Sequence, residues 1–279
     1  MTHPASSAPL SLEIAALTDP GALRSLNEDS IATVDELGLL VLSDGMGGYQ
    51  SGDVASSLTT RVIVEGLTRE LRGKPVHGDD VAGVVEDVVK RANRAIYLEG
   101  QQRAQRILNQ QDQTMGSTLA LLLFRNNQVT LAHVGDSRIY RLRANRLELL
   151  THDHSLLQEQ LDLGILSAEA AATSHNRHLV TRGLGLQPEV EVALNACEAL
   201  PGDIYLVCSD GLNDMVDNAD IELVLNSLQA NLPLAASQLV MIANDHGGED
   251  NISVILAKVK SRTAPDATTN GFFSRIFGR

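Results

Sequence analysis

The chain has 279 residues, and a hydrophobic content of 43% is enough to build the core of one large domain or of two small ones. Acidic residues outnumber basic ones by 35 to 22, and the resulting net charge of −13 argues against general binding to nucleic acid or to an anionic membrane. Aromatic residues make up only 3% of the chain and Trp is absent, which weakens any case for stacking bases or sugars.

The cysteines and the N-terminus bear on the cellular compartment. Cys197 and Cys208 lie in apolar, strand-like contexts without the spacing of metal ligands, so we interpret them as reduced core residues. The N-terminus, MTHPASSAPLSLE, lacks the basic and apolar regions of a signal peptide, and no apolar run approaches the ~18 residues of a membrane span. We therefore expect a cytoplasmic protein.

The first half of the chain is predicted to form strands and then two helices. A polar lead at 1–9 comes first, and the polar tract 99–113 at the end is either a helical extension or a loop. Between them, alternating or continuous apolar residues predict strands, and apolar residues at every third or fourth position predict amphipathic helices. The strands are expected at 10–17, 30–34 and 38–42, and the helices within 54–71 and 81–96.

The second half returns to strands, which we interpret at first as one antiparallel meander. Its four strands are expected at 117–124, 129–136, 137–143 and 146–151. A lid-like insertion follows at 155–181, with two short helices around Gly164. Two more strands, two helices and a last strand are then expected at 189–194, 203–211, 220–229, 234–247 and 251–259.

Hairpin links dominate this order, strands outnumber helices, and the helices come in pairs. This combination predicts antiparallel sheets packed against each other with helices on the outside, a mixed α/β (α+β) class. No repeat with a fixed period occurs, so we expect one domain over residues 10–260.

Aspartates mark the ends of three predicted strands. Asp44 and Asp210 each follow an apolar run within Ser-Asp-Gly, and Asp136 ends a third run within HVGDS. A fourth aspartate, Asp250, stands at the start of the last strand. Carboxylates that converge at a sheet edge repel one another unless a cation lies between them, and an all-oxygen set favours Mg²⁺ or Mn²⁺ over Zn²⁺. The alternative for any single copy is that Asp-Gly only marks a turn.

Histidines gather at the entrance of the lid-like insertion and within it. They are His152, His154, His175 and His178. The spacings H-x-H and H-x-x-H could hold a metal, but no cysteine lies near and no helical i, i+4 pair occurs. Surface or capping histidines are therefore the interpretation that we favour.

Eight short motifs are similar, in order and rough spacing, to those of the metal-dependent Ser/Thr phosphatases of the PPM or protein phosphatase 2C family, bacterial branch. The motifs are R-x-x-N-E-D (24–29), S-D-G-M-G-G (43–48), G-S-T (116–118), V-G-D-S-R (134–138), H-D-H-S (152–155), R-G-L-G (182–185), S-D-G-L (209–212) and G-x-D-N-I (248–252). They span about 240 residues of the chain. The resemblance implies a four-layer α-β-β-α sandwich, in which two antiparallel sheets are flanked by helix pairs and two metals lie at one edge.

The resemblance also implies a set of metal ligands. Asp44 would bridge two Mn²⁺ or Mg²⁺ ions, the carbonyl of Gly45 would ligate one of them, and Asp210 and Asp250 would hold the other. Asp136 together with Asp210 resembles the third metal site of bacterial members.

Three further residues take their roles from the same motifs. Glu28 and Asp29 would orient metal-bound water, and Arg24 would bind the substrate phosphate. Many eukaryotic members have a histidine, proposed as general acid, where this chain has Met46, which cannot donate a proton. The resemblance therefore implies hydrolysis of phosphoserine and phosphothreonine in proteins, opposing a bacterial Ser/Thr kinase, with an unassigned proton donor. A catalytically weak, metal-dependent regulatory interaction module is the alternative.

The C-terminal segment 261–279 is a small-residue tether that ends in FFSRIFGR. Phe272, Phe273, Ile276 and Phe277 would share one face of a short helix. Eight residues are too few for a stable isolated helix in water. The segment could fold back onto the domain, or it could serve as a peptide that docks peripherally on a kinase, a substrate or a membrane surface.

Overall fold

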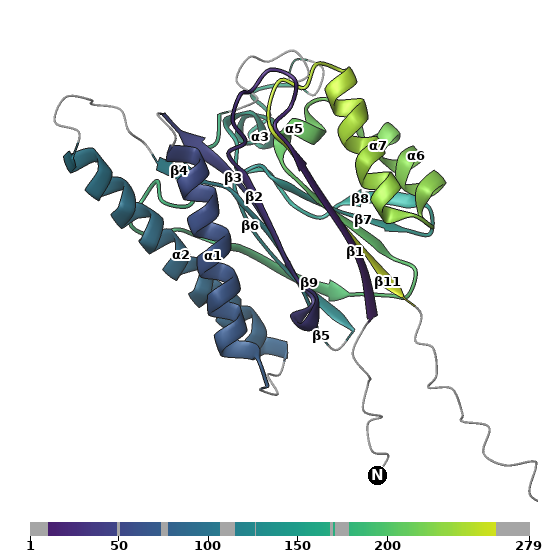
Figure 1. Cartoon of the computed structure of the whole chain (residues 1–279), viewed down its shortest axis with the longest axis horizontal. Helices are drawn as coiled ribbons and strands as arrows, with labels where there is room; N and C mark the ends of the chain where they lie inside the picture. The colour runs from purple at the N-terminus through teal and green to yellow at the C-terminus, as the bar shows by residue number, and fades with distance from the viewer. Residues whose placement is uncertain are drawn as a thin grey trace, which may run out of the picture.

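The computed structural model describes residues 11–48, 51–73, 78–106, 115–125, 127–167, 170 and 179–260 (Figure 1). The lead at 1–9, the C-terminal segment 261–279, His175 and His178 lie outside these ranges. None of the described helices combines the length and the hydropathy that crossing a membrane requires.

Two antiparallel sheets form the centre of the molecule, as predicted. The first has the strand order β1 (Ser11–Asp19), β11 (Ile252–Lys260), β10 (Ile204–Cys208), β7 (Arg138–Arg143) and β8 (Arg146–Leu149). The second has the order β2 (Asp29–Val34), β3 (Leu39–Gly47), β5 (Leu119–Arg125), β6 (Gln128–Val134) and β9 (Ala193–Glu198), with β4 (Met115–Ser117) paired to β3.

Helix pairs cover the outer faces of both sheets (Figure 1). The covering helices are α1 (Ser51–Leu71) and α2 (Gly78–Arg106) on the second sheet, and α6 (Asn218–Leu228) and α7 (Leu232–Asp245) on the first. The short helices are η1 (Asp35–Leu37), α3 (Leu156–Asp162) and α5 (Asp210–Asn213). The helices, sheets and helices form four layers, so the predicted sandwich is confirmed.

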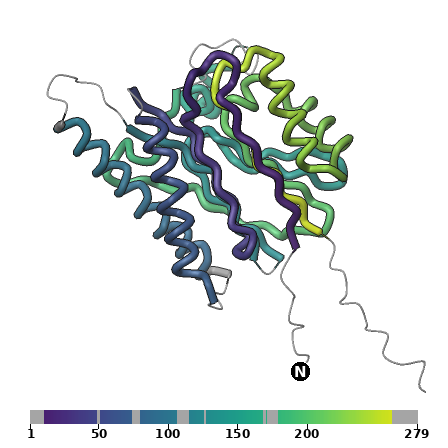
Figure 2. The backbone as a smooth tube through the Cα atoms, viewed as in Figure 1, coloured from purple at the N-terminus to yellow at the C-terminus, as the bar shows by residue number. Residues whose placement is uncertain are grey.

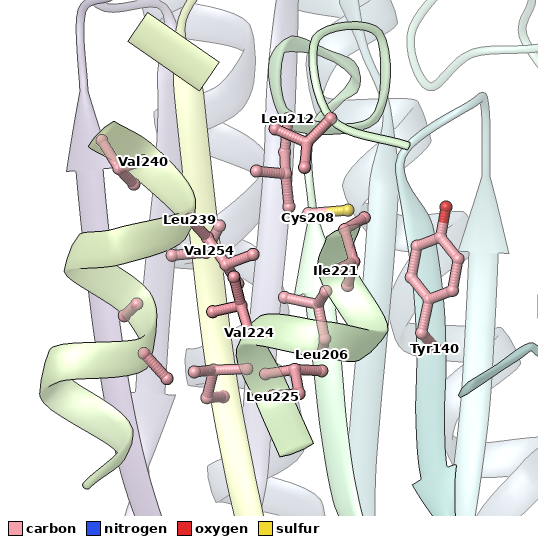
Figure 3. Packing of buried hydrophobic residues seen from close by; sticks show 14 of the residues in the cluster. Tyr140, Leu206, Cys208, Leu212, Ile221, Val224, Leu225, Leu239, Val240 and Val254 are labelled. Atoms are coloured by element: carbon pink, nitrogen blue, oxygen red, sulfur yellow. The ribbon is translucent and has the colours of Figure 1, made fainter. Parts of the chain in front are cut away.

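The central strands bury both faces, and this explains their continuous apolar runs. In β3, Leu39 and Val41 pack under α1 and α2, while Leu40 and Leu42 enter the core between the sheets. Alternate side chains of β10 divide in the same way, and Leu206 and Cys208 lie beneath α6 and α7 (Figure 3). Side chains alternate across a strand, so a strand in an inner layer needs apolar residues at every position.

The predicted single meander is wrong at one link. β5 pairs with β6, and β7 pairs with β8, but the two hairpins belong to different sheets. The chain passes between sheets at Gly135, which has a φ of 103°, a backbone conformation that strongly favours glycine. Asp136 follows directly, so this crossing places it between the two sheets.

The strand expected at 189–194 also lies elsewhere, because the structure forms β9 over Ala193–Glu198. Residues 189–192 alternate whereas Ala193–Glu198 do not, so periodicity favoured the wrong segment. Pairing with β6 sets Ala193 opposite His133 and Glu198 opposite Gln128. The polar tract after residue 99 continues α2 as far as Arg106, which supports the helical extension up to that residue.

The first and last described strands lie side by side. β1 and β11 pair over their full length, from Ser11 opposite Lys260 to Asp19 opposite Ile252. In Figure 2 the purple strand runs next to the yellow one, and the loop after β1 meets the segment before β11 at one end of the sandwich. That end carries the aspartates.

Candidate active site

Five strand ends meet at one edge of the sandwich and deliver the acidic residues found in the sequence. The residues at this edge line a cavity of about 340 Å³. Its walls include Arg24, Glu28, Asp44, Gly45, Met46, Thr118, Asp136, Val180, Asp210, Asp250 and Asn251. The structure thus brings together every predicted site residue except Asp29, which lies directly behind the wall as the cross-strand neighbour of Asp44.

Burial raises the pKa of several carboxyl groups at this edge. It raises the pKa of Asp29 to about 7, although the hydroxyls of Ser209 and Ser253 lower it. Burial, and after it the charge of Asp29, holds the pKa of Asp44 well above its usual range. The pKa of Asp136 is likewise well above its usual range, through burial and the charge of Asp210. Burial and mutual repulsion therefore favour the protonated form of these carboxyl groups in the absence of cations.

Two glycines allow the oxygens of this edge to approach one another. A Cβ on Gly52 would lie 2.7 Å from the Gly45 carbonyl oxygen and 2.7 Å from Glu28 Oε1. A Cβ on Gly45 would lie 2.0 Å from the carbonyl oxygen of Gly52. The start of α1 thus leaves a cradle of oxygens that a side chain would fill. Burial, and then the charge of Asp53, raises the pKa of Glu28 in this cradle.

The residues present fit a pair of hard divalent cations. The donor set is carboxylates and a backbone carbonyl, which Mg²⁺ and Mn²⁺ accept, and Asp29 Oδ1 is buried without a hydrogen-bond partner in the described part of the chain. Among the described residues, no three side chains of Asp, Glu, His or Cys lie as close together as in a closed metal cage. Like charges hold carboxylates apart until a cation lies between them.

Arg24 enters the site from the loop after β1. Its Nη2 donates to Asp250 Oδ2 over 2.7 Å and its Nε donates to the Glu249 carbonyl over 3.3 Å. Both side chains of the ion pair are partly exposed, Arg24 by 50% and Asp250 by 37%. The guanidinium therefore lies at the rim of the cavity, where a ligand can reach it.

Two buried hydroxyls hold the aspartates in place, and the sequence motifs alone did not reveal this role. Thr118 Oγ1 accepts from the Asp44 amide over 2.9 Å and lies 2.7 Å from Ser137 Oγ. Ser209 Oγ donates to Asp29 Oδ2 over 2.8 Å. Thr118 and Ser209 belong to the motifs G-S-T and S-D-G-L. The sequence signal that could have revealed their role therefore lay in the motifs themselves.

The described histidines support loops. His152 Nε2 lies 2.7 Å from Asp162 Oδ2, and His154 Nδ1 accepts from the Gly135 amide over 3.1 Å while its ring stacks on His133. Burial lowers the pKa of His154 to about 3, so the ring is neutral. These contacts fix the base of the lid-like insertion beside Asp136.

Comparisons with known proteins identify the family of this chain. The family model described as protein phosphatase 2C matches residues 24–240. The chain is 33% identical over 244 residues to the serine/threonine phosphatase stp of Listeria innocua, covering 86% of this chain and 93% of that protein. The crystal structure of the Mycobacterium tuberculosis serine/threonine phosphatase PstP/Ppp has a TM-score of 0.79 and 35% identity, covering 90% of this chain and 99% of that one.

A further structure, the catalytic domain of the serine threonine protein phosphatase PstP in complex with two manganese ions, has a TM-score of 0.77 and 35% identity. It covers 90% of this chain and all of that one. The family model spans most of the described residues, including Arg24, Asp44, Asp136 and Asp210. This chain therefore belongs to the protein phosphatase 2C family.

Proposed function

We propose that this protein hydrolyses phosphoserine and phosphothreonine in proteins, with two Mn²⁺ or Mg²⁺ ions at the sheet edge. One observation carries the proposal: strand ends bring Asp44, Asp136, Asp210 and Asp250 to a single cavity that has Arg24 at its rim. Carboxylates suit hard cations, and a guanidinium suits a phosphate. The same cavity can therefore hold both the ions and a phosphate monoester.

Asp44, the Gly45 carbonyl, Asp210 and Asp250 are the residues that we assign to the two ions. Asp136, which shares the cavity with Asp210, is assigned to a third ion. When bound, such ions supply a water molecule activated for in-line attack on phosphorus, and they neutralise phosphate charge.

The remaining assignments concern the substrate and its protons. Arg24 binds phosphate oxygens through the guanidinium N–H groups that its contacts with Asp250 and Glu249 do not use. Glu28 and Asp29 are assigned to orient the water, Glu28 from the cavity wall and Asp29 from its place beside Asp44. The side chain of Met46 lines the cavity but carries no acidic proton, so the departing serine or threonine oxygen takes its proton from water or from another residue.

The proposed partners are phosphoproteins, including a Ser/Thr kinase and its substrates, in the cytoplasm. Residues 10–260 form the phosphatase domain in this proposal. The lid-like insertion 155–181 selects among substrates, and its base lies at the cavity through Val180. The segment 261–279 is the candidate docking peptide.

Hydrolysis of an aryl phosphate and of a phosphothreonine peptide, with and without Mn²⁺, tests the proposal. We expect turnover of both that requires the ion and is lost in chelator. Binding of Mn²⁺ without turnover of either compound would contradict it and would favour the metal-dependent interaction module. An Asp87→Asn variant, which changes an exposed carboxylate on α2, serves as the control and should match the parent protein.

A further inference from the structure

Asn251 directly follows Asp250, and its side chain is only 5% exposed. It holds three backbone groups of the loop that carries Arg24. Nδ2 donates to the carbonyls of Pro20 and Leu26, each over 2.9 Å, and Oδ1 accepts from the Glu28 amide over 2.8 Å. One side chain thus forms hydrogen bonds with both ends of the loop.

The chemistry of these partners fixes the orientation of the amide. Carbonyls only accept and a backbone N–H only donates, so a flipped amide would lose all three hydrogen bonds. Both Nδ2 hydrogens are used in this way. Although Asn251 borders the cavity, its amide therefore serves the loop and is not turned to a ligand.

The apolar side chains of the loop do little to hold it. Leu23 and Leu26, the apolar side chains on either side of Arg24, are 72% and 51% exposed. The Gly248 carbonyl is a further anchor and accepts from the amides of Ala22 and Leu23 over 2.9 and 3.1 Å. At the ends of the loop, the Gly21 amide donates to Asp19 Oδ1, the Asn27 side chain donates to Thr18 Oγ1, and the Gly45 amide donates to the Glu28 carbonyl. Figure 2 shows this loop, in purple, against the yellow segment before β11. Residues 248–251 therefore supply most of the described hydrogen bonds that anchor the loop.

We propose that Asn251 is a positioning residue that sets the place of Arg24 relative to Asp250. The inference rests on the proposed role of Arg24 as the phosphate ligand. Because the same short segment provides a metal ligand and fixes the Arg24 loop, the ions and the guanidinium keep one geometry around the phosphate. Loss of the amide should loosen phosphate binding while Asp250 still binds its ion.

The test compares Asn251→Ala, Arg24→Ala and the double variant at saturating Mn²⁺. Asn251→Ala should raise the KM for a phosphothreonine peptide and the inhibition constant of inorganic phosphate about tenfold, with kcat changed much less. Mn²⁺ stoichiometry measured by calorimetry should stay as in the parent protein. Because Asn251 acts through Arg24, the double variant should have the same KM as Arg24→Ala.

Asn93→Ala is the matched control. Asn93 is also a buried asparagine that makes three hydrogen bonds to loop backbone, accepting from Gly185 and donating to Gln187 and Pro188. It should lower the melting temperature about as much as Asn251→Ala and leave the inhibition constant of phosphate unchanged. An equal rise in that constant for both variants would show general loosening and overturn the proposal.

Two other outcomes would also overturn it. Independent, multiplying effects of Asn251→Ala and Arg24→Ala would mean that Asn251 does not act through Arg24, and loss of Mn²⁺ from Asn251→Ala would mean that it supports Asp250 instead. If the parent protein fails to hydrolyse the peptide, the proposed function fails, but calorimetry of inorganic phosphate with the Mn²⁺-loaded proteins still decides the role of Asn251.

Discussion

Asp29 and Asp44 are direct cross-strand partners in the pairing of β2 with β3, so two carboxylates stand side by side at one buried sheet edge. The pKa of Asp29 is raised to about 7 by burial, and the pKa of Asp44 lies well above its usual range through burial and the neighbouring Asp29. Without cations, neither carboxylate can ionise in the fold as readily as in the unfolded chain. The edge is therefore destabilising at neutral pH until ions bind.

Asp29→Asn should stabilise the metal-free protein at neutral pH. The folded-state pKa of about 7 exceeds the usual 3.8, so the folded protein holds a proton that the unfolded chain has released. Asp29 therefore lowers the unfolding free energy of the parent protein progressively from pH 4 to pH 7, and the reduction stays constant above that range. In chelator at pH 7 we expect a gain on the order of 1–3 kcal/mol for the variant, and no gain at pH 4.

Urea denaturation at several pH values measures this difference. Asp87→Asn, an exposed change on α2, controls for the general removal of negative charge. Added Mn²⁺ should reverse the order of stability, because the ions bind the parent site more tightly. Equal stability of Asp29→Asn and the parent protein in chelator at pH 7 would refute the prediction.

Asp210→Asn and Asp250→Asn should each lower kcat at least about a hundredfold, because each removes a charged ligand from an ion. The melting temperature in chelator should change little, since these carboxylates serve the ion and not the core. Glu249→Gln, an exposed change beside Asp250, is the control and should keep turnover within about twofold. Near-normal turnover of either aspartate variant at saturating Mn²⁺ would exclude the two-metal assignment.

Asp136→Ala should lower activity on phosphopeptides while two ions remain bound. Asp136 lies where the chain crosses between the sheets, apart from the β2–β3 pair, so its loss should empty only the third site. Metal stoichiometry by calorimetry, measured together with kinetics, decides the matter. Loss of all metal would make Asp136 a primary ligand, and unchanged kinetics would mean that the third site is idle.

The lid-like insertion should set peptide preference and matter little for small substrates. Its base is closed by a bridge between Ser155 and Val180 and by the Thr181 amide, which donates to the His154 carbonyl over 2.9 Å. Replacing residues 157–178 with two glycines would keep these two contacts. We expect aryl phosphate turnover within about threefold of the parent protein, and changes above about tenfold among phosphopeptides. Equal effects on both substrate types would exclude a role in specificity.

Truncation at Ala264 tests the C-terminal segment, which lies outside the described residues. Docking predicts unchanged aryl phosphate turnover and an unchanged melting temperature, with weaker binding to a phosphorylated kinase domain or to vesicles. A lower melting temperature with no binding lost would show that the segment belongs to the core instead.

The sequence predicted most elements and the convergence of the aspartates because each depends on local order. An apolar run that ends at Asp44 or Asp210 sets the strand and its last residue together, and Asp250 opens the final strand in the same way. The assignment of β6 and β7 to different sheets was not predictable, because the periodicity of a strand does not show which sheet the strand joins. The hydrogen bond from Asn251 to Pro20 was not predictable either, since it joins residues 231 positions apart.

The pairing of β1 with β11 has a consequence for synthesis of the protein. The ribosome makes β1 first among the described strands and β11 last, and Asp250 and Asn251 immediately precede β11. Until that strand has emerged, a nascent chain lacks both a proposed metal ligand and the anchor of the Arg24 loop. Phosphatase activity should therefore arise only after release of β11 from the ribosome exit tunnel, and fragments that end before residue 250 should be inert in the cell.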